Sequence, residues 1–270
     1  MRAVALPIHV AAVQYATEMY DKTTDTDRAL HLLDDAAHTA DLVLLPETSF
    51  TGYWLGKDMV KFAEPVPGPM TAIACEIAIT SNAYICFGIA ERDGDKIYNT
   101  AVLVGADGNL VGKHRKAHLF KADVESGFTP GDELEVFDTS LGKIGILICF
   151  DAFHIESVRV LDMKGAQLVL IPSVGLVIPP ETAESTLYSW ETVLRANAKY
   201  GRCHVVWANK IGKDGELAAV GNSMVLDPQG QIIARGDTEE EVVRASITLK
   251  PKQIRLGRRP ELYAPIAEAG

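Results

Sequence analysis

The sequence predicts a mixed α/β fold. Short runs rich in Val, Ile and Leu alternate with longer segments that carry apolar residues at helical spacing. Asp-Gly dipeptides such as Asp93-Gly94, Asp107-Gly108 and Asp214-Gly215 stand between runs and indicate tight hairpins. Because hairpins join antiparallel strands, the sheet structure cannot be purely parallel.

The expected elements follow one another along the whole chain. Strands are predicted at 8–15, 42–45, 84–90, 101–104, 144–149, 168–171, 204–209 and 223–226. Helices are predicted at 26–40, 71–81, 155–164 and 183–200. Gly165 and Gly201 are placed to end the last two helices, since glycine readily adopts the left-handed conformation found there.

Length and composition predict one domain over residues 1–270. The chain has 270 residues, 47% of them hydrophobic, which is enough for one large core, and no linker divides it. The last ten or so residues have a weak structural pattern, and a tail from about residue 249 is expected to take part in oligomer contacts.

Charge and cysteine usage exclude several function classes. With 36 acidic and 26 basic residues the net charge is -10, which repels nucleic acid and anionic membranes. No apolar run approaches the roughly 20 residues of a membrane helix. Pro7 and His9 interrupt the apolar start, so a strand is expected there and no leader. Four cysteines without CxxC spacing predict reduced thiols in the cytoplasm, with no metal site.

Three segments have the residue types of a reactive site, although each alone has an ordinary structural explanation. Glu47 follows the apolar run 42–45 and Pro46, at a strand end where α/β proteins form their sites, but a solvated loop carboxylate has the same pattern. Lys116 lies in the basic run 113–118, which is equally typical of a solvated loop. The run is too short and the chain too acidic for nucleic-acid binding, so one placed ammonium is the better functional interpretation.

Cys149 ends the apolar run 144–148 and is followed at once by a polar segment. Most strand cysteines are small buried hydrophobes. A cysteine at a strand-to-helix turn can instead be a nucleophile, if a base and a cation activate its thiol.

Together these segments resemble the nitrilase-like carbon-nitrogen hydrolase superfamily, and within it the amidase-like branch. The matching motifs are Leu45-Pro46-Glu47, Arg115-Lys116-Ala117-His118-Leu119 and Ile148-Cys149-Phe150-Asp151, in the order and at the separations typical of that superfamily. Further matches extend over nearly the whole chain, at Ala12-Val13-Gln14, Thr51-Gly52-Tyr53, Thr129-Pro130-Gly131, Ile171-Pro172-Ser173 and Gly221-Asn222-Ser223-Met224. The long helix departs from the family pattern, with Asn197-Ala198-Lys199 where x-Glu-Asn is usual.

The resemblance implies a fold and a mechanism. The fold is a four-layer αββα sandwich with two mixed sheets. Cys149 is the nucleophile, Glu47 the general base and acid, and Lys116 the cation that faces the oxyanion together with the N–H of Phe150. Glu125 is expected to be a fourth catalytic residue that positions Lys116. No cofactor is required.

The resemblance also leads to expectations about the pocket and the substrate. Residues next to the motifs are expected to bind substrate, namely Tyr53, Phe120, Phe150, Phe153 and Val174. Because amidases of the superfamily tend to have Cys-(Tyr or Phe)-Asp and nitrilases Cys-Trp-Glu, a small amide is expected, either neutral or a monocarboxylate. Nitriles, N-carbamoyl amides and a non-catalytic binding or assembly module remain as alternatives.

A homodimer or larger homo-oligomer is expected from the resemblance. The segment 183–200 has more large apolar residues than one covered sheet face needs, and a two-fold contact would bury the excess. The helix after Cys149 is expected near this interface, so that a charge placed at Val158 or Leu161 should weaken association and activity together. The tail with Leu256, Leu262 and Tyr263 is expected to lie across the partner.

Overall fold

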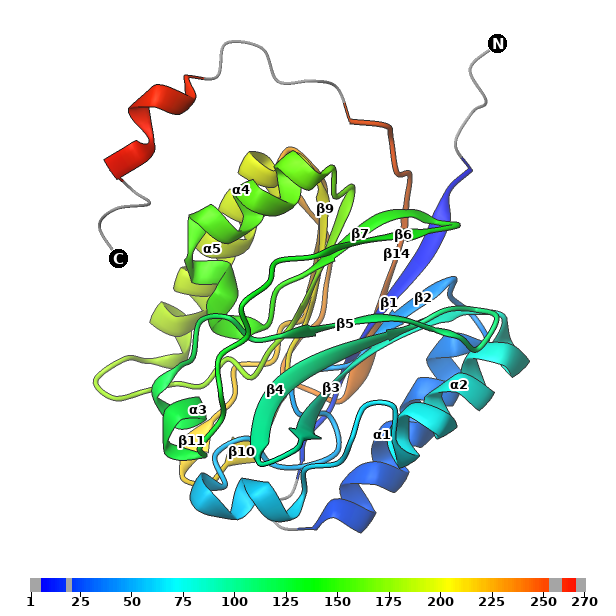
Figure 1. The fold of residues 1–270 in the computed structure, drawn as a ribbon, viewed down its shortest axis with the longest axis vertical. Helices are drawn as coiled ribbons and strands as arrows, with labels where there is room; N and C mark the ends of the chain where they lie inside the picture. Colours follow the sequence, from blue (N-terminus) through cyan, green and yellow to red (C-terminus); the bar gives the residue numbers. More distant parts are fainter. Residues whose placement is uncertain (1–5, 18–20, 253–258, 266–270) are drawn as a thin grey trace.

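The computed structural model describes residues 6–17, 21–252 and 259–265, and its strands form two large sheets (Figure 1). The first sheet has, in order across it, β14 (Glu241–Ile247), β1 (Ile8–Gln14), β2 (Leu42–Leu44), β3 (Tyr84–Asp93), β4 (Lys96–Val104) and β5 (Leu110–Arg115). The second has β13 (Ile232–Arg235), β12 (Met224–Leu226), β9 (His204–Ala208), β8 (Leu168–Pro172), β7 (Gly142–Ile146) and β6 (Val136–Thr139). A small hairpin joins β10 (Lys213–Asp214) to β11 (Leu217–Ala218).

Helices cover the outer faces of the two sheets, α1 (Lys22–Ala37) and α2 (Pro69–Ser81) on the first, α4 (Ile155–Lys164) and α5 (Ala183–Gly201) on the second (Figure 1). The short α3 (Lys121–Glu125) and the 3-10 turns η1 (Gly56–Lys61), η2 (Cys149–Phe153) and η3 (Pro260–Leu262) complete the described elements. Within each sheet three strands are parallel, β1-β2-β3 and β7-β8-β9, and the flanking strands are antiparallel. The expected sandwich with two mixed sheets is confirmed.

The alternation of side chains along β1 shows how the layers are held together. Val10 and Ala12 point into the cluster shared by both sheets, whereas Ala11 and Val13 join the cluster under α1 and α2. Successive strand residues face opposite sides of a sheet, so a strand with both faces covered is apolar throughout. This is why the run 8–15 shows no regular polar alternation, although it contains His9 and the buried Gln14.

Most predicted boundaries agree with the structure within a few residues, and the exceptions have physical causes. Gly165 ends α4 with φ 95°, as expected for a left-handed cap. Gly201 is still helical, and Arg202 ends α5 with φ 48°. The prediction missed β5, β6, β13 and β14, which are edge strands or lie next to exposed surface and therefore carry many polar residues.

The expected placement of Val158 and Leu161 at a subunit interface is wrong. Both side chains have no exposed area and pack under α4 against the second sheet. On α5, Trp190 and Leu194 are likewise buried within the chain, whereas Tyr188 is 74% exposed. Much of the apolar surface of α5 therefore belongs to the chain's own core.

The beginning of the C-terminal tail is attached to the same subunit. Leu249 packs in the core, and Lys252 Nζ lies 2.8 Å from Asp162 Oδ1 of α4. Leu262 and Tyr263 follow at the surface, 57% and 44% exposed, and Leu256 lies outside the described residues. A search of the described residues finds no helix long and apolar enough to cross a membrane.

Candidate active site

Glu47 is buried at the carboxyl end of β2, where the chain approaches β3 very closely. Gly88 of β3 makes this approach possible, because a Cβ there would lie 2.6 Å from Pro46 O and 2.7 Å from Glu47 Cα. The two segments are joined by hydrogen bonds from Ser49 N to Gly88 O at 2.9 Å and from Gly88 N to Pro46 O at 3.2 Å. A glycine on the neighbouring strand thus sets the position of Glu47.

Three donors hold the carboxylate of Glu47. Its Oε1 accepts from Lys116 Nζ and from Asn99 Nδ2, both at 2.7 Å. Its Oε2 accepts from the backbone N–H of Val174 at 3.0 Å. Both oxygens have partners, and the side chain is held in one orientation.

Lys116 follows β5 and has no exposed area. Its Nζ lies between two carboxylates, 2.7 Å from Glu47 Oε1 and 2.6 Å from Asp123 Oδ2. It also donates to Tyr53 Oη at 3.4 Å. Asn99 Nδ2 donates to Asp123 Oδ1 at 2.9 Å as well as to Glu47, so one amide joins both carboxylates.

Cys149 lies at a sharp turn between β7 and η2, with a φ of 46° that few residues other than glycine adopt. A strained backbone of this kind is often found where a side chain is held for chemistry. The Sγ atom lies 4.0 Å from Val174 O, and the side chain is 7% exposed toward a cavity. The thiol is therefore the part of the site that substrate can reach.

Burial and the neighbouring charges shift the pKa values of these groups. Burial raises the pKa of the Glu47 carboxyl, and the charge of Lys116 opposes that shift. Burial also raises the pKa of the Cys149 thiol well above its usual value, with the charge of Glu47 acting in the same direction. Burial acts to lower the pKa of Lys116, but its anionic neighbours outweigh this, and the pKa is raised well above the usual range. The site therefore contains a firmly protonated ammonium, a protonated thiol and a carboxylate with increased proton affinity.

Asp151 fixes the turn that carries Cys149. Its buried carboxylate accepts from Ile148 N at 3.0 Å, and from His118 N and Nδ1 at 2.8 and 2.9 Å. His114 Nε2 lies 2.9 Å from Asp151 Oδ2. These contacts hold the pKa of Asp151 well below its usual range against the effect of burial, and they connect the Lys116 loop to the Cys149 turn.

The expectation that Glu125 positions Lys116 is wrong. Glu125 is exposed at the end of α3, where its Oε2 accepts from Trp54 Nε1 at 2.6 Å. The carboxylate beside Lys116 is that of Asp123, which is fully buried. The two residues are two positions apart in one short helix, so their side chains leave it in different directions.

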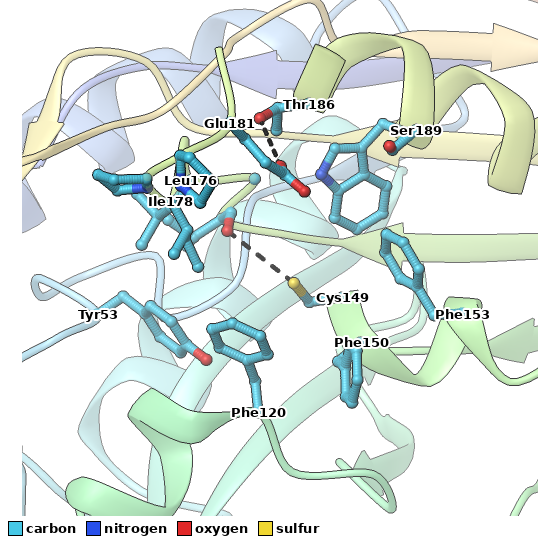
Figure 2. A pocket seen from close by; sticks show the side chains of 15 residues that line it. Tyr53, Phe120, Cys149, Phe150, Phe153, Leu176, Ile178, Glu181, Thr186 and Ser189 are labelled. Atoms are coloured by element: carbon cyan, nitrogen blue, oxygen red, sulfur yellow. Dashed lines mark hydrogen bonds between the residues drawn. The ribbon is translucent and has the colours of Figure 1, made fainter. Parts of the chain in front are cut away.

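A cavity of about 410 Å³ opens onto the Cys149 thiol (Figure 2). All five residues expected to bind substrate line it: Tyr53, Phe120, Phe150, Phe153 and Val174. Residues from the loop after β8 and from α5 complete the wall, among them Leu176, Ile178, Glu181, Thr186, Ser189 and Trp190. Among the described residues, no group of three or more His, Cys, Asp or Glu side chains is arranged to hold a metal ion.

Lys210 is a buried lysine next to the site that the sequence analysis missed. Its Nζ donates to Thr48 O at 2.9 Å, Thr51 O at 2.8 Å and Thr17 Oγ1 at 3.0 Å. Burial lowers its pKa to about 8. Thr48 follows Glu47 directly, so Lys210 ties the loop 48–54 to the second sheet. A lysine after a strand has no sequence signal that distinguishes this position from a surface one.

The family follows from sequence comparison. Residues 9–253 match the carbon-nitrogen hydrolase family. The chain belongs to the carbon-nitrogen hydrolase family. Among curated relatives, a nitrilase of Pyrococcus abyssi is 34% identical over 248 residues, covering 90% of this chain and 90% of the relative. The omega-amidase NIT2 of Homo sapiens is 33% identical over 262 residues, covering 90% and 92%.

Solved structures of carbon-nitrogen hydrolases have the same fold. The crystal structure of Saccharomyces cerevisiae Nit3, a member of the nitrilase superfamily, superposes with a TM-score of 0.81 at 27% identity, covering 100% of this chain and 96% of that one. An amidase from Nesterenkonia sp. gives a TM-score of 0.79 at 23% identity, covering 98% of each chain, a likeness that concerns the fold alone.

Proposed function

We propose that this carbon-nitrogen hydrolase cleaves a small amide to a carboxylic acid and ammonia through a thioester on Cys149. The observation that carries the proposal is a set of contacts that connects the cavity-lining Cys149 to Glu47 and Lys116. The Cys149 thiol faces the cavity, Glu47 is held beside it through Val174, and Lys116 is held by Glu47 and Asp123. These are a nucleophile, a proton carrier and a cation for the oxyanion.

In the first half-reaction Glu47 takes the proton of the Cys149 thiol as the sulfur bonds to the amide carbon. The raised pKa of Glu47 increases the proton affinity of its carboxylate, which favours its action as the base. The carbonyl electrons move onto oxygen, where the ammonium of Lys116 and the N–H of Phe150 stabilise the charge, a contribution of about 3 to 4 kcal/mol for one such donor. The carbon-nitrogen bond then breaks as Glu47 passes its proton to the departing nitrogen.

In the second half-reaction the same groups hydrolyse the thioester. Glu47 takes a proton from water as the water oxygen bonds to the acyl carbon, and the oxyanion again faces Lys116. The carbon-sulfur bond breaks, the sulfur regains a proton from Glu47, and the acid leaves. The net reaction consumes one water for each ammonia released.

Nitriles and N-carbamoyl amides are the alternative substrates. The sequence Cys149-Phe150-Asp151 favours amides, and so does the similarity to proteins named omega-amidase. A relative of similar identity is named a nitrilase, so short amides must be compared directly with their matching nitriles. A higher kcat/KM for the nitriles would replace the amide assignment.

The first test is the variant Cys149→Ala. We expect loss of ammonia release from short aliphatic amides, with wild-type thermal stability, because the substitution removes the nucleophile and little core volume. Mass spectrometry of wild type mixed with substrate should show the acyl adduct on Cys149 only. The matched control is Cys75→Ala on α2, away from the cavity, which should keep full activity. A Cys149→Ala protein that retains more than a few per cent of turnover contradicts the mechanism and favours a binding module.

We also propose a symmetric dimer formed through the outer layer of α4 and α5. Large apolar side chains are exposed there, with exposed fractions of 59% for Met163, 74% for Tyr188 and 52% for Tyr200. Tyr188→Glu should shift the mass in light scattering from about twice 29.2 kDa toward the monomer. Ile233→Glu on β13 is the control and should leave the mass unchanged. A monomeric wild-type protein at micromolar concentration contradicts this proposal.

We further propose a cytoplasmic location. All four cysteines are free in the structure, and unpaired thiols are usual in reducing compartments. Equal thiol counts by Ellman titration in unfolded protein before and after reduction would support it.

A further inference from the structure

The charge distribution around the cavity bears on which amides can enter it. Of the fifteen described residues that line the cavity, Glu181 is the only charged one, and none is Lys, Arg or His. Most of the others are aromatic or aliphatic, including Phe120, Phe150 and Trp190. An acyl chain that ends in a carboxylate would find no cation in this wall and would meet Glu181.

Glu181 is an exposed residue whose carboxylate lies in the cavity wall and accepts a hydrogen bond from α5. Thr186 Oγ1 of α5 donates to Glu181 Oε2 at 3.0 Å, and the backbone N–H of Glu181 donates to Ile178 O at 2.9 Å. Thr186 is itself 5% exposed. In Figure 2 the carboxylate points toward the interior, across the cavity from Tyr53 and Phe120, with the Cys149 sulfur between.

Aromatic rings line the same cavity as this carboxylate. Trp190 and Phe153 meet edge to face with centroids 4.9 Å apart, and Phe150 lies 5.7 Å from Phe153. Aromatic faces attract ammonium and guanidinium groups, and a carboxylate among them adds a direct charge partner. Together they have the chemistry that recognises an organic cation.

The beginning of α5 is another source of positive potential near the cavity, and two of its first backbone donors, Ser185 N and Thr186 N, are already used by Thr182. Thr182 caps the helix, with its Oγ1 accepting from Ser185 N at 3.2 Å, and Glu181 directly precedes this cap. A substrate carboxylate in this region would therefore compete with a fixed anion for the helix dipole.

We infer that the cavity selects amides whose acyl chain is apolar and ends in a positively charged amine or guanidine, with Glu181 as the specificity-determining residue. This inference rests on the proposed amide hydrolysis at Cys149. It replaces the expectation that a monocarboxylate amide is as suitable as a neutral one. The reacting amide lies at the thiol, the methylene chain along the aromatic wall, and the cationic end at Glu181.

The test compares three amides of equal chain length, namely ω-aminovaleramide, hexanamide and glutaric acid monoamide, which are cationic, neutral and anionic. Wild type should have its highest kcat/KM for ω-aminovaleramide and its lowest for the monoamide. Glu181→Gln should lower the ratio of kcat/KM for ω-aminovaleramide to kcat/KM for hexanamide about three- to tenfold, as expected for a partly solvated charge pair. Glu181→Lys should reverse the order of the two charged substrates. Glu184→Gln, exposed on α5 outside this cavity, is the control and should match wild type.

Binding to Cys149→Ala separates this inference from the proposed function. Calorimetry should show ω-aminovaleramide binding more tightly than hexanamide, and Glu181→Gln in the same background should remove the difference. If wild type hydrolyses none of the amides while this binding preference holds, the proposed reaction is wrong and the recognition stands. If wild type hydrolyses amides but prefers the monoamide, or if Glu181→Gln affects the neutral and cationic amides equally, the inference is overturned.

Discussion

Lys116 and Lys210 are both fully buried at strand ends beside the Glu47 loop, but their neighbours differ. Lys116 lies between the carboxylates of Glu47 and Asp123, which raise its pKa well above the usual range against the effect of burial. Lys210 donates mainly to neutral oxygens, and burial lowers its pKa to about 8. The partners of a buried lysine, more than its depth, determine whether its charge is stabilised. In the proposed mechanism the first lysine offers a permanent charge to the substrate, and the second orders the backbone of the Glu47 loop.

The largest effect is expected for Lys116→Met. Activity should fall by at least about a hundred- to a thousandfold, because an oxyanion donor is lost. The variant should also be destabilised by about 3 to 5 kcal/mol, since Glu47 and Asp123 would be left as buried carboxylates without a cation. Urea unfolding and steady-state kinetics on a short amide measure the two effects.

The double variant Lys116→Met/Asp123→Asn separates the two effects. Removing one carboxylate should restore part of the lost stability without restoring turnover. Asp123→Asn alone should lower kcat, because Lys116 loses a partner, while Glu125→Gln should remain close to wild type. A loss of activity in Glu125→Gln equal to that in Asp123→Asn would contradict the placement of Lys116 described here.

Lys210→Met should have a smaller catalytic effect and a clear structural one. The substitution leaves Thr48 O and Thr51 O without their donor, at a cost of about 1 to 3 kcal/mol for each unpaired group. Loop movement should displace Glu47 and reduce kcat roughly tenfold, with KM less affected. Lys213→Met, at an exposed position on β10, is the matched control. Full activity and stability in Lys210→Met would show that the loop is ordered without it.

The smallest effect concerns pH. With a folded pKa of about 8 and an ordinary value of 10.5, Lys210 binds fewer protons in the folded than in the unfolded chain between these pH values. The free energy of unfolding of wild type relative to Lys210→Met should therefore rise with pH over this window, by up to about 3 kcal/mol, and stay constant below it. Because the pKa of Lys116 is raised above 10.5 in the folded chain, its contribution to the free energy of unfolding is fully present below pH 10.5. That contribution is lost only as the pH rises above this value. Urea unfolding at several pH values tests the rise, and a fall would contradict the low pKa of Lys210.

Local sequence patterns predicted much of the fold and several residues of the site. Apolar periodicity predicted α4 and the strands of both sheet centres, and the motifs around Glu47, Lys116 and Cys149 predicted groups that do meet. The position of Asp123 was missed because motif alignment is uncertain by a residue or two. On a short helix, a shift of two positions selects an exposed residue such as Glu125 in place of a buried one such as Asp123.

Other features depend on contacts far apart in the chain. Lys210 is buried by Thr17 and Thr48, which lie 193 and 162 residues away in sequence. Glu181 belongs to no motif, and only the fold brings it to the cavity of Cys149. Val158 and Leu161 have helical spacing that suits either a sheet or a partner subunit, so periodicity alone cannot decide which surface covers them.

The main chain of Val174 contacts both of the proposed reacting groups of the site. The N–H of Val174 donates to Glu47 Oε2 at 3.0 Å, and its carbonyl oxygen lies 4.0 Å from Cys149 Sγ. Every genetically encoded residue except proline has the same main-chain N–H and carbonyl group. Alanine scanning and most other substitutions at position 174 therefore leave the contacts to the proposed base and nucleophile unchanged. Semisynthesis can replace the amide that carries the Val174 nitrogen with an ester, which removes the N–H donor alone. The rate of this variant would show how much of catalysis depends on the main-chain contact to Glu47.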